Sequence, residues 1–465
     1  MTLFFNKFTG EGWAIEIADL KENSFDLLSL YVLDKKKYPF LLESSSRGNR
    51  NNRYSIIFYK PNIILEKINH KIEFLKEFDN LWKQKRVEQK NFSFECKNIP
   101  FCGGWFIYLG YEIAQEIETT LNIPLSPYNL PTAFAARVKS AIIYDHIENK
   151  LILASENFED SDQAIVEMKN DLNKIIKHSK KERTNGKITI LSKGSSEEHQ
   201  DQVKKCIEYI YQGEIFQANL SRLWQFKTSL SIEESSIYKE LRRFNPSPFA
   251  GLVSYKDSTI ISSSPERLVS VRGNILETRP IAGTRPRGSS GLHDIELSKE
   301  LINSDKEKAE HLMLLDLERN DISRVCEPGT VKVNEKMIIE SYAHVHHIVS
   351  NVVGKKLENI SPGQIISAVF PGGTITGCPK IRCMEILGDL EKIGRGPYTG
   401  SLGYVTHSGD MDINILIRSI LKEGDIMYLR AGGGIVADSV PENETLETEA
   451  KASAMLKAIS SFQNE

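Results

Sequence analysis

The chain has 465 residues, of which 59 are lysine or arginine and 62 are aspartate or glutamate, so its formal net charge is −3. This balance excludes a dedicated nucleic-acid-binding protein, which needs a basic excess or a basic stripe. Charged residues make up 26% and hydrophobic residues 40% of the chain, which is typical of a globular protein and excludes a disordered one.

The lack of recognisable targeting segments and the pattern of cysteines indicate a cytoplasmic protein. No uninterrupted apolar stretch approaches the ~20 residues needed to cross a bilayer, so we expect no membrane association. The amino-terminal residues lack the positive, apolar and small-residue segments of a signal peptide. The six cysteines are scattered, with no C-x-x-C pair and no histidine at zinc-binding spacing. Scattered cysteines fit a reducing compartment, so we expect a cytoplasmic protein.

The first part of the chain alternates strand-like runs with helical patches. Apolar side chains at helical spacing predict a helix over 163–176. A polar segment with turn residues follows and places a boundary near 178–198, which divides the chain into residues 1–180 and 195–460. Clusters of β-branched and aromatic residues predict three strands, at 54–59, 141–144 and 151–154.

The second part carries more strands. Residues 198–213 are typical of a helix that ends at glycine, and 292–322 of a long helical stretch interrupted near 303–304. A closing helix is predicted over 443–462. Many strands with irregularly placed helices predict an α+β fold. The predicted strands are 215–220, 259–263, 268–271, 402–405, 413–417 and 426–429.

Two glycine-rich segments are candidates for close contact with a ligand. Residues 370–380 contain three glycines, two threonines and Lys380, so their backbone N–H groups can turn toward an anion. A tight turn between elements is an equally good interpretation, and the spacing is not that of a P-loop. Residues 432–434 are consecutive glycines that follow a predicted strand, where backbone can approach a ligand.

Carboxylates and a histidine supply further candidates. Glu310 and Glu447, from distant segments, suit octahedral magnesium together with waters and an anionic substrate. The plainer interpretation of Glu447 is a solvated pair with Lys451 one helical turn later. His347 can serve acid–base chemistry, and Glu266 at the end of a strand can point into a cleft. A buried structural histidine and a turn carboxylate are the corresponding plainer interpretations.

In their order along the chain, these segments closely resemble the chorismate-utilising enzymes. The match covers about 200 to 457, its motifs are collectively specific, and residues 40–44 and 53–57 extend it into the amino-terminal region. The motifs that carry the resemblance are Gly213–Leu220, Ser264–Arg267, Thr278–Thr284, Asp316–Asp321, Val345–Ser350, Phe370–Lys380, Met411–Arg418 and Gly432–Ser439.

The resemblance implies two large, mostly antiparallel sheets flanked by helices, with an active site in the carboxy-terminal region. It implies Glu266 as the general acid for the departing C4 hydroxyl, assisted by His347 and Thr374, and Mg²⁺ on Glu310 and Glu447. A general acid must keep its proton near neutral pH, so its pKa should be raised. The residues implied to bind substrate are Gln217, Ala282, Gly283, Thr284, Tyr398, Arg418, Gly432, Gly433, Gly434 and Lys451.

Within the family, the sequence indicates ammonia as the nucleophile. Isochorismate and salicylate synthases resemble the chain but carry a water-activating lysine at the position of Gln217, and glutamine has no useful pKa. Asn219, residues 245–251, His346 and the 370–377 block look like aminodeoxychorismate synthase component I. The expected reaction therefore converts chorismate and ammonia to 4-amino-4-deoxychorismate, for 4-aminobenzoate and folate synthesis.

Ala282 does not fit those aminodeoxychorismate synthases that use a lysine nucleophile. Some aminodeoxychorismate synthases have a lysine nucleophile at this position, and alanine excludes covalent capture of the ring. Either ammonia attacks directly, or the chain resembles anthranilate synthase component I and makes anthranilate for tryptophan synthesis. A third hypothesis, a non-catalytic chorismate-binding subunit, predicts damage at the acid and metal positions, and these positions are intact.

The family also implies a partner and an effector pocket. No glutaminase domain is recognisable in the chain, so we expect a separate glutamine amidotransferase subunit that supplies ammonia. A small-molecule pocket like the family's tryptophan site is expected in the amino-terminal region, and a structural pocket without a regulatory role is the alternative. The matching positions are Ser44, Arg53, Tyr54, Pro248 and Phe249.

Overall fold

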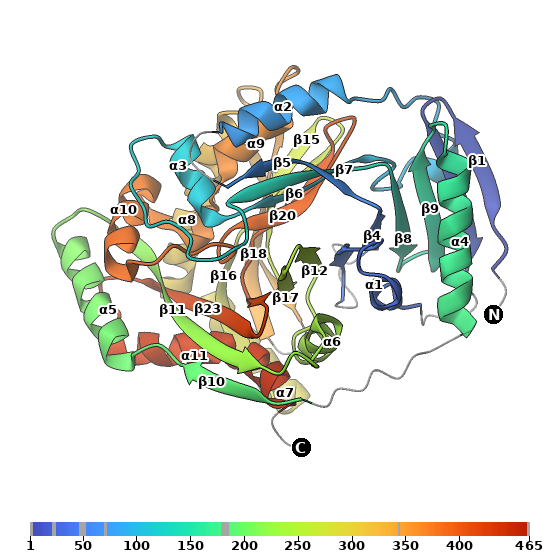
Figure 1. The fold of residues 1–465 in the computed structure, drawn as a ribbon. Helices are drawn as coiled ribbons and strands as arrows, with labels where there is room; N and C mark the ends of the chain where they lie inside the picture. The colour runs from blue at the N-terminus through green and yellow to red at the C-terminus, as the bar shows by residue number, and fades with distance from the viewer. Residues whose placement is uncertain are drawn as a thin grey trace.

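The structure is a computed structural model that describes residues 3–20, 25–45, 53–68, 72–177, 186–342 and 345–462. Among these residues, the strands form one sheet of 13 strands and one of 10, and every pairing is antiparallel. Helices flank both sheets (Figure 1). The predicted α+β fold with two large, mostly antiparallel sheets is therefore confirmed.

The larger sheet runs through the whole chain, with the short strand β19 paired to β11 off the main order. In spatial order its strands are β1 (Asn6–Gly10), β2 (Trp13–Asp19), β9 (Lys150–Glu156), β8 (Ser140–Asp145), β4 (Tyr54–Tyr59), β3 (Phe40–Glu43), β12 (Phe249–Tyr255), β13 (Ser258–Ser264), β22 (Ser419–Glu423), β23 (Ile426–Ile435), β11 (Gln217–Thr228) and β10 (Ile188–Ser192), with β19 at Gly377–Cys378.

The smaller sheet packs face to face against the larger one, and β17 pairs with β18 off its main order. In spatial order its strands are β16 (Ile281–Pro286), β18 (Val345–Lys355), β15 (Ile275–Thr278), β14 (Arg267–Arg272), β21 (Met411–Asn414), β20 (Ser401–Thr406), β6 (Gly104–Leu109), β7 (Ala133–Val138) and β5 (Asn62–Lys67), with β17 at Lys332–Ser341.

Helices cover the outer faces of the two sheets (Figure 1). The α-helices are α1 (Leu28–Leu33), α2 (Phe74–Gln84), α3 (Ala114–Ile117), α4 (Ser161–Lys177), α5 (Ser196–Tyr211), α6 (Glu234–Phe244), α7 (Gly291–Asn303), α8 (Asp305–Ser323), α9 (Pro362–Val369), α10 (Lys380–Glu391) and α11 (Pro441–Ser460). The 3-10 turns in the described parts of the chain are η1 (Phe94–Cys96), η2 (Tyr111–Ile113) and η3 (Gly373–Ile375). None of the helices in the described ranges is both long and apolar enough to cross a membrane.

Strand periodicity explains the layers. Successive side chains of a strand point to opposite faces, so a strand with both faces buried needs apolar residues at every position. In β4, Ile56 and Phe58 point into the core between the two sheets, whereas Ile57 and Tyr59 point into the core beneath the helices. This double burial explains the cluster of β-branched and aromatic residues that predicted the strand.

The two parts of the chain are interleaved in both sheets. In the larger sheet, β3 pairs with β12 through Leu41 and Leu252, which lie opposite each other. In the smaller sheet, β6 pairs with β20 through Ile107 and Gly403. Residues 1–180 and 195–460 therefore each contribute strands to both sheets.

Most of the predicted elements are present, and three boundaries were wrong. The strand predicted at 215–220 begins at Gln217 and continues to Thr228, because β11 pairs along its length with β23. The strand predicted at 413–417 ends at Asn414, because the backbone of Ile415 turns to bond Glu266. The glycines at 432–434 do not follow β23 but lie within it, where their small size admits neighbouring groups.

Candidate active site

Glu266 lies in the short connection between β13 and β14, at the edge where the chain passes from one sheet to the other. Its side chain is only 4% exposed. The Thr374 hydroxyl, in the turn η3, donates a hydrogen bond of 2.8 Å to Glu266 Oε1. The Ile415 N–H donates to the Glu266 carbonyl at 3.0 Å, which fixes the backbone. Two distant segments thus hold this residue, one through its carboxyl and the other through its backbone.

The surroundings raise the pKa of this carboxyl. Burial, with the negative charge of Glu318 as a smaller cause, raises the pKa of Glu266 to about 7, against the Thr374 hydrogen bond and the charge of Arg418. A carboxyl with this pKa is able to donate a proton near neutral pH.

His347 lies on β18 with a neutral ring. Its Nδ1 is 3.2 Å from the Gly283 carbonyl oxygen and 3.0 Å from the Thr284 hydroxyl. A carbonyl only accepts, so Nδ1 carries the proton and Nε2 is an acceptor. Burial, followed by the positive charges of Arg418 and Lys451, lowers the His347 pKa to about 3. Nε2 is buried and has no hydrogen-bond partner among the described residues, so it offers a lone pair to a ligand.

A bulge in β16 orients the residues opposite His347. The pairing of β16 with β18 shifts register between Ala282 and Thr284, and Gly283 has a φ of +67°. An extra residue in the left-handed conformation is the usual construction of such a bulge, and glycine adopts it without strain. The bulge turns the Gly283 carbonyl and the Thr284 hydroxyl toward the same histidine nitrogen.

The glycines of β23 make room for groups of neighbouring strands. A Cβ on Gly432 would lie 2.5 Å from the Leu220 carbonyl oxygen and 2.8 Å from the Tyr398 hydroxyl. A Cβ on Gly434 would overlap the Gln217 amide nitrogen. Gln217 Oε1 is buried without a hydrogen-bond partner in the described parts of the chain. The arrangement leaves polar groups and bare backbone at one surface.

Two cations stand near this surface. Lys451 Nζ lies 2.7 Å from Glu447 Oε1 and donates to the Gly432 carbonyl at 3.0 Å. Arg418 has a φ of +50° and donates to Asn245 Oδ1 at 3.3 Å. Both cations lower the pKa of His347, so their fields reach the same ring. They are therefore suited to an anionic ligand lying next to that ring.

Carboxylates from α8 and α11 gather beside the glycines. Burial, and then the charges of Glu307 and Glu447, raise the pKa of Glu310 to about 7. Glu444 Oε1 accepts from the Ser439 hydroxyl at 2.6 Å, while its Oε2 is buried without a partner among the described residues. Clustered carboxylates that repel one another are a suitable environment for a cation.

Lys380 forms an ion pair with Asp321. Its Nζ lies 2.5 Å from Asp321 Oδ2, so α10 and α8 are joined by an ion pair rather than Lys380 being free for an anion. The anion-binding role of residues 370–380 stays a prediction, and Lys380 contributes to it only if it leaves Asp321. Thr374 from the same segment does reach the site, through its hydrogen bond to Glu266.

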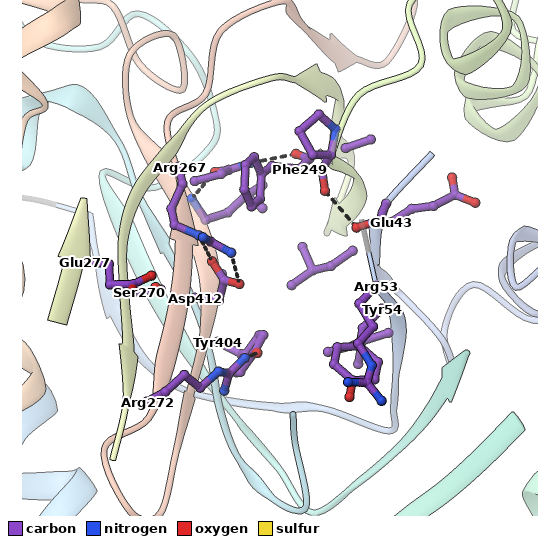
Figure 2. A pocket seen from close by; sticks show the side chains of 18 residues that line it. Glu43, Arg53, Tyr54, Phe249, Arg267, Ser270, Arg272, Glu277, Tyr404 and Asp412 are labelled. Atoms are coloured by element: carbon purple, nitrogen blue, oxygen red, sulfur yellow. Dashed lines mark hydrogen bonds and ion pairs between the residues drawn. The ribbon is translucent and has the colours of Figure 1, made fainter. Parts of the chain in front are cut away.

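A separate cavity of about 260 Å³ lies between the two sheets, and all five predicted effector-pocket residues line it. Figure 2 shows Arg267 paired with Asp412 on one wall, with Arg53 and Tyr54 on the opposite wall. The Arg267–Asp412 pair is bidentate, at 2.8 and 3.0 Å. Arg53 is bound to Asp145 at 2.9 Å.

The sequence did not single out Glu444 or Glu318, and it marked Asn219 only as a subfamily position. Within the described ranges, Asn219 Oδ1 and Glu444 Oε2 are buried without a hydrogen-bond partner, and Glu318 is a carboxyl on the buried face of α8. The helical spacing of 314, 315, 318 and 322 contains the signal for Glu318, because a charged residue stands in an otherwise apolar stripe. Asn219 reaches the glycines of β23 through strand pairing, and Glu444 reaches them through the packing of α11 on β23.

Comparison with known proteins identifies the family to which the chain belongs. Residues 38–457 match the family of chorismate binding enzymes. The chain is 39% identical over 454 residues to aminodeoxychorismate synthase component 1 of Bacillus subtilis (strain 168), covering 93% of this chain and 94% of that protein. It is 37% identical over 450 residues to anthranilate synthase component 1 of Acetivibrio thermocellus, covering 90% of each.

Solved structures show the same fold. Anthranilate synthase component I from Streptococcus pneumoniae TIGR4 superimposes with a TM-score of 0.75 at 29% identity, over 88% of this chain and 93% of that one. The isochorismate synthase MenF from Escherichia coli, at 18% identity, shares the fold with a TM-score of 0.72, over 97% and 95%. The chain therefore belongs to the chorismate binding enzyme family, as a chorismate-utilising enzyme of the anthranilate and aminodeoxychorismate synthase component I type.

Proposed function

We propose that the protein is an aminodeoxychorismate synthase component I, which converts chorismate and ammonia to 4-amino-4-deoxychorismate and water. The observation that carries the proposal is the buried acid Glu266 in a site where Gln217 stands in place of a base for water. A glutamine amide cannot take a proton from water, so a nucleophile that needs no such base is favoured. The Bacillus subtilis relative supports amination at C4.

Each group has a role in this reaction. Glu266 gives its proton to the leaving C4 hydroxyl, so that the C4–O bond breaks and water departs while ammonia supplies the nitrogen. Arg418, Lys451 and the backbone of 432–434 bind the carboxylates of chorismate. His347 Nε2 accepts a hydrogen bond from the substrate, since its ring is neutral. Thr374 keeps the Glu266 carboxyl oriented.

Magnesium fits the carboxylate cluster. The donors are oxygens only, the charges of Glu307 and Glu447 act on Glu310 against the opposing charge of Lys306, and Glu444 Oε2 has no hydrogen-bond partner within the described ranges. No group of three such side chains already converges as a cage within the described ranges. Mg²⁺ keeps waters and takes one or two protein carboxylates plus the substrate, so Glu310 and Glu447 suffice to hold it. When bound, the ion would neutralise a chorismate carboxylate.

Metal dependence is a first prediction. Removal of divalent ions with a chelator is expected to reduce turnover at least ~10-fold, and added Mg²⁺ to restore it. Glu444→Gln is expected to raise the Mg²⁺ concentration that gives half-maximal activity without changing the product. The measurement is a magnesium titration of initial rates for the wild type and the variant. Turnover that is insensitive to chelation would contradict the magnesium site.

The pH dependence of turnover follows from Glu266. Because burial raises its pKa to about 7, the acid is protonated below that pH and loses its proton above it. We therefore expect kcat to fall as pH rises through about 7. Rates must be compared at a constant concentration of free ammonia, since ammonium deprotonates over a higher range. A kcat that rises steadily to alkaline pH would contradict an acid role for Glu266.

The proposed function is tested by identifying the products that the chain forms from chorismate. The purified chain is incubated with chorismate, Mg²⁺ and ammonium, with and without aminodeoxychorismate lyase. Formation of 4-aminobenzoate only with the lyase is the expected result. The Glu266→Gln variant controls for spontaneous chemistry. A parallel incubation with glutamine is expected to give product only when a glutamine amidotransferase subunit is added, since we propose such a subunit as the ammonia source.

Anthranilate synthesis is the second candidate. Ala282 on β16 provides no nucleophile to capture the ring, and the Acetivibrio thermocellus relative is an anthranilate synthase component 1 of similar identity. In the same experiment, anthranilate formed without the lyase would assign amination to C2 and reject the C4 proposal.

The cavity between the sheets is proposed as an effector pocket for tryptophan. It offers cations, carboxylates and the Phe249 ring to an aromatic amino acid (Figure 2). Tryptophan at ~100 times its Kd would stabilise the chain by about 2.7 kcal/mol, visible as a rise in Tm. Ser270→Leu, which fills the cavity, is expected to abolish this rise. No heat of binding and no thermal shift for the wild type would remove the effector proposal.

A further inference from the structure

A second buried carboxyl, Glu318, lies close to Glu266 and has no role in the reaction described above. It sits on α8, in the buried stripe formed with Leu314, Leu315 and Ile322, and is 6% exposed. A carboxyl at a position with apolar spacing carries a large desolvation cost. The position therefore invites a functional explanation.

One turn of the chain contacts both carboxyls. Thr374 of η3 donates to Glu266 Oε1 at 2.8 Å. A Cβ on the preceding residue, Gly373, would lie 3.5 Å from Glu318 Oε1 and 2.5 Å from Leu317, so the turn is pressed onto α8. Consecutive residues of η3 thus contact Glu266 and Glu318, and the absence of a side chain at Gly373 permits the close approach.

Several charges act on the two carboxyls. Burial, and then the charge of Asp321, raise the pKa of Glu318 to about 7, while Lys380 opposes them. The charge of Glu318 in turn adds to the burial that raises the pKa of Glu266, and Arg418 opposes it. Two interacting acids titrate as a pair, so the loss of either proton depends on the charge of the other.

The groups that face Glu318 from other elements are polar rather than positively charged, apart from Lys380 on α10. The Thr278 hydroxyl at the end of β15 and the Gly373 N–H favour its charged form. Lys380 itself is bound to Asp321 at 2.5 Å, which reduces the charge left for Glu318. Arg324, at the end of α8, also acts on Asp321. Once Glu318 has lost its own proton, its negative charge is therefore available to act on Glu266.

We propose that Glu318 is a positioning residue that keeps the proton on Glu266, by placing a carboxylate beside it across the Gly373–Thr374 turn. The inference rests on the proposed function, in which Glu266 is the acid. After Glu266 gives its proton to the leaving hydroxyl, its carboxylate faces that of Glu318, and the repulsion favours its reprotonation from solvent before the next turnover.

The first test is the pH profile of Glu318→Gln, which keeps the shape of the side chain and removes the charge. At constant free ammonia, the fall of kcat at alkaline pH is expected to move to lower pH by about one unit, with near wild-type kcat on the acidic side. Glu318→Asp, which retains the charge, is expected to recover part of the wild-type profile. An equal loss of kcat at every pH would show a merely structural role and overturn the proposal.

A matched control removes a buried carboxyl elsewhere. Asp79 on α2 also has a pKa raised by burial, and it accepts from the Gly363 N–H at 2.8 Å at the start of α9. Asp79→Asn is expected to change stability and leave the alkaline fall of kcat in place. If Glu318→Gln does not fold, Glu318→Leu fits the apolar stripe and carries the same expected shift.

A second measurement does not depend on turnover. The infrared C=O stretch of protonated glutamate is followed against pH, with the band of Glu266 assigned as the one missing from Glu266→Gln. In Glu318→Gln this band is expected to disappear at lower pH than in the wild type. An unchanged midpoint would overturn the inference, whereas a failure of the wild type to aminate chorismate would overturn only the proposed function.

Discussion

Glu266→Gln is expected to lower kcat for chorismate amination by about 10²–10⁴-fold, the usual contribution of a general acid. The amide keeps the size of the carboxyl and can still accept the Thr374 hydrogen bond of 2.8 Å, so the turn should remain in place. What is lost is the proton for the departing hydroxyl. The measurement is steady-state kinetics with ammonium as nitrogen source.

Measuring chorismate binding to Glu266→Gln distinguishes a loss of catalysis from a loss of structure. We expect Glu266→Gln to bind chorismate with nearly wild-type affinity, because the cations Arg418 and Lys451 are unchanged. Thr374→Val, which removes only the hydrogen bond to the acid, is the graded control and is expected to lose less activity. A Glu266→Gln enzyme with undiminished kcat would mean that another group supplies the proton.

Glu391→Gln is expected to destabilise the fold by about 3–5 kcal/mol, as for other broken buried ion pairs. Glu391 ends α10 and accepts from Arg395 at 2.8 and 2.9 Å, from Arg430 at 3.1 Å, and from the N–H and hydroxyl of Ser221. Arg395 is 2% exposed. Loss of the charge leaves two buried guanidinium groups with too little compensation.

Urea unfolding at two pH values checks this expectation. The pKa of Glu391 is lowered, with burial opposing and the charges of Arg395 and Arg430 prevailing. Its stabilisation is therefore present above its unfolded pKa and is lost as pH falls through the folded value. The difference between wild type and Glu391→Gln should shrink in acid. Glu73→Gln removes an exposed partner of Lys76 and should change the midpoint little.

The sequence predicted local structure well where one physical signal dominates. The strand at 54–59 consists of β-branched and aromatic residues apart from Ser55 because both of its faces are buried, and Ser304 ends one helix and caps the next as the interruption near 303–304 predicted. Boundaries were wrong where tertiary pairing decides. The alternation of Trp224, Gln225, Phe226 and Lys227 was not used to extend the strand, yet residues 221–227 form a ladder with β23.

The candidate site was predictable through motif order rather than through spacing. Glu310 and Glu447 are 137 positions apart in the sequence, and only the tertiary fold brings their charges within reach of each other. Glu318 was missed because one carboxyl within a helical stripe is usually read as a solvated position. The interaction of Glu318 with Glu266 depends on η3, which no periodicity predicts.

The two parts of the chain are interleaved in both sheets, and this predicts what would happen if the chain were divided into two fragments. Because β3 joins β12 and β6 joins β20, a cut between α4 and β10 would leave two fragments that each lack neighbouring strands in both sheets. Neither fragment could close its core alone, and each would expose apolar edges to aggregation. Supplied together, the fragments should reconstitute one particle, so they behave as complementing halves rather than transferable modules.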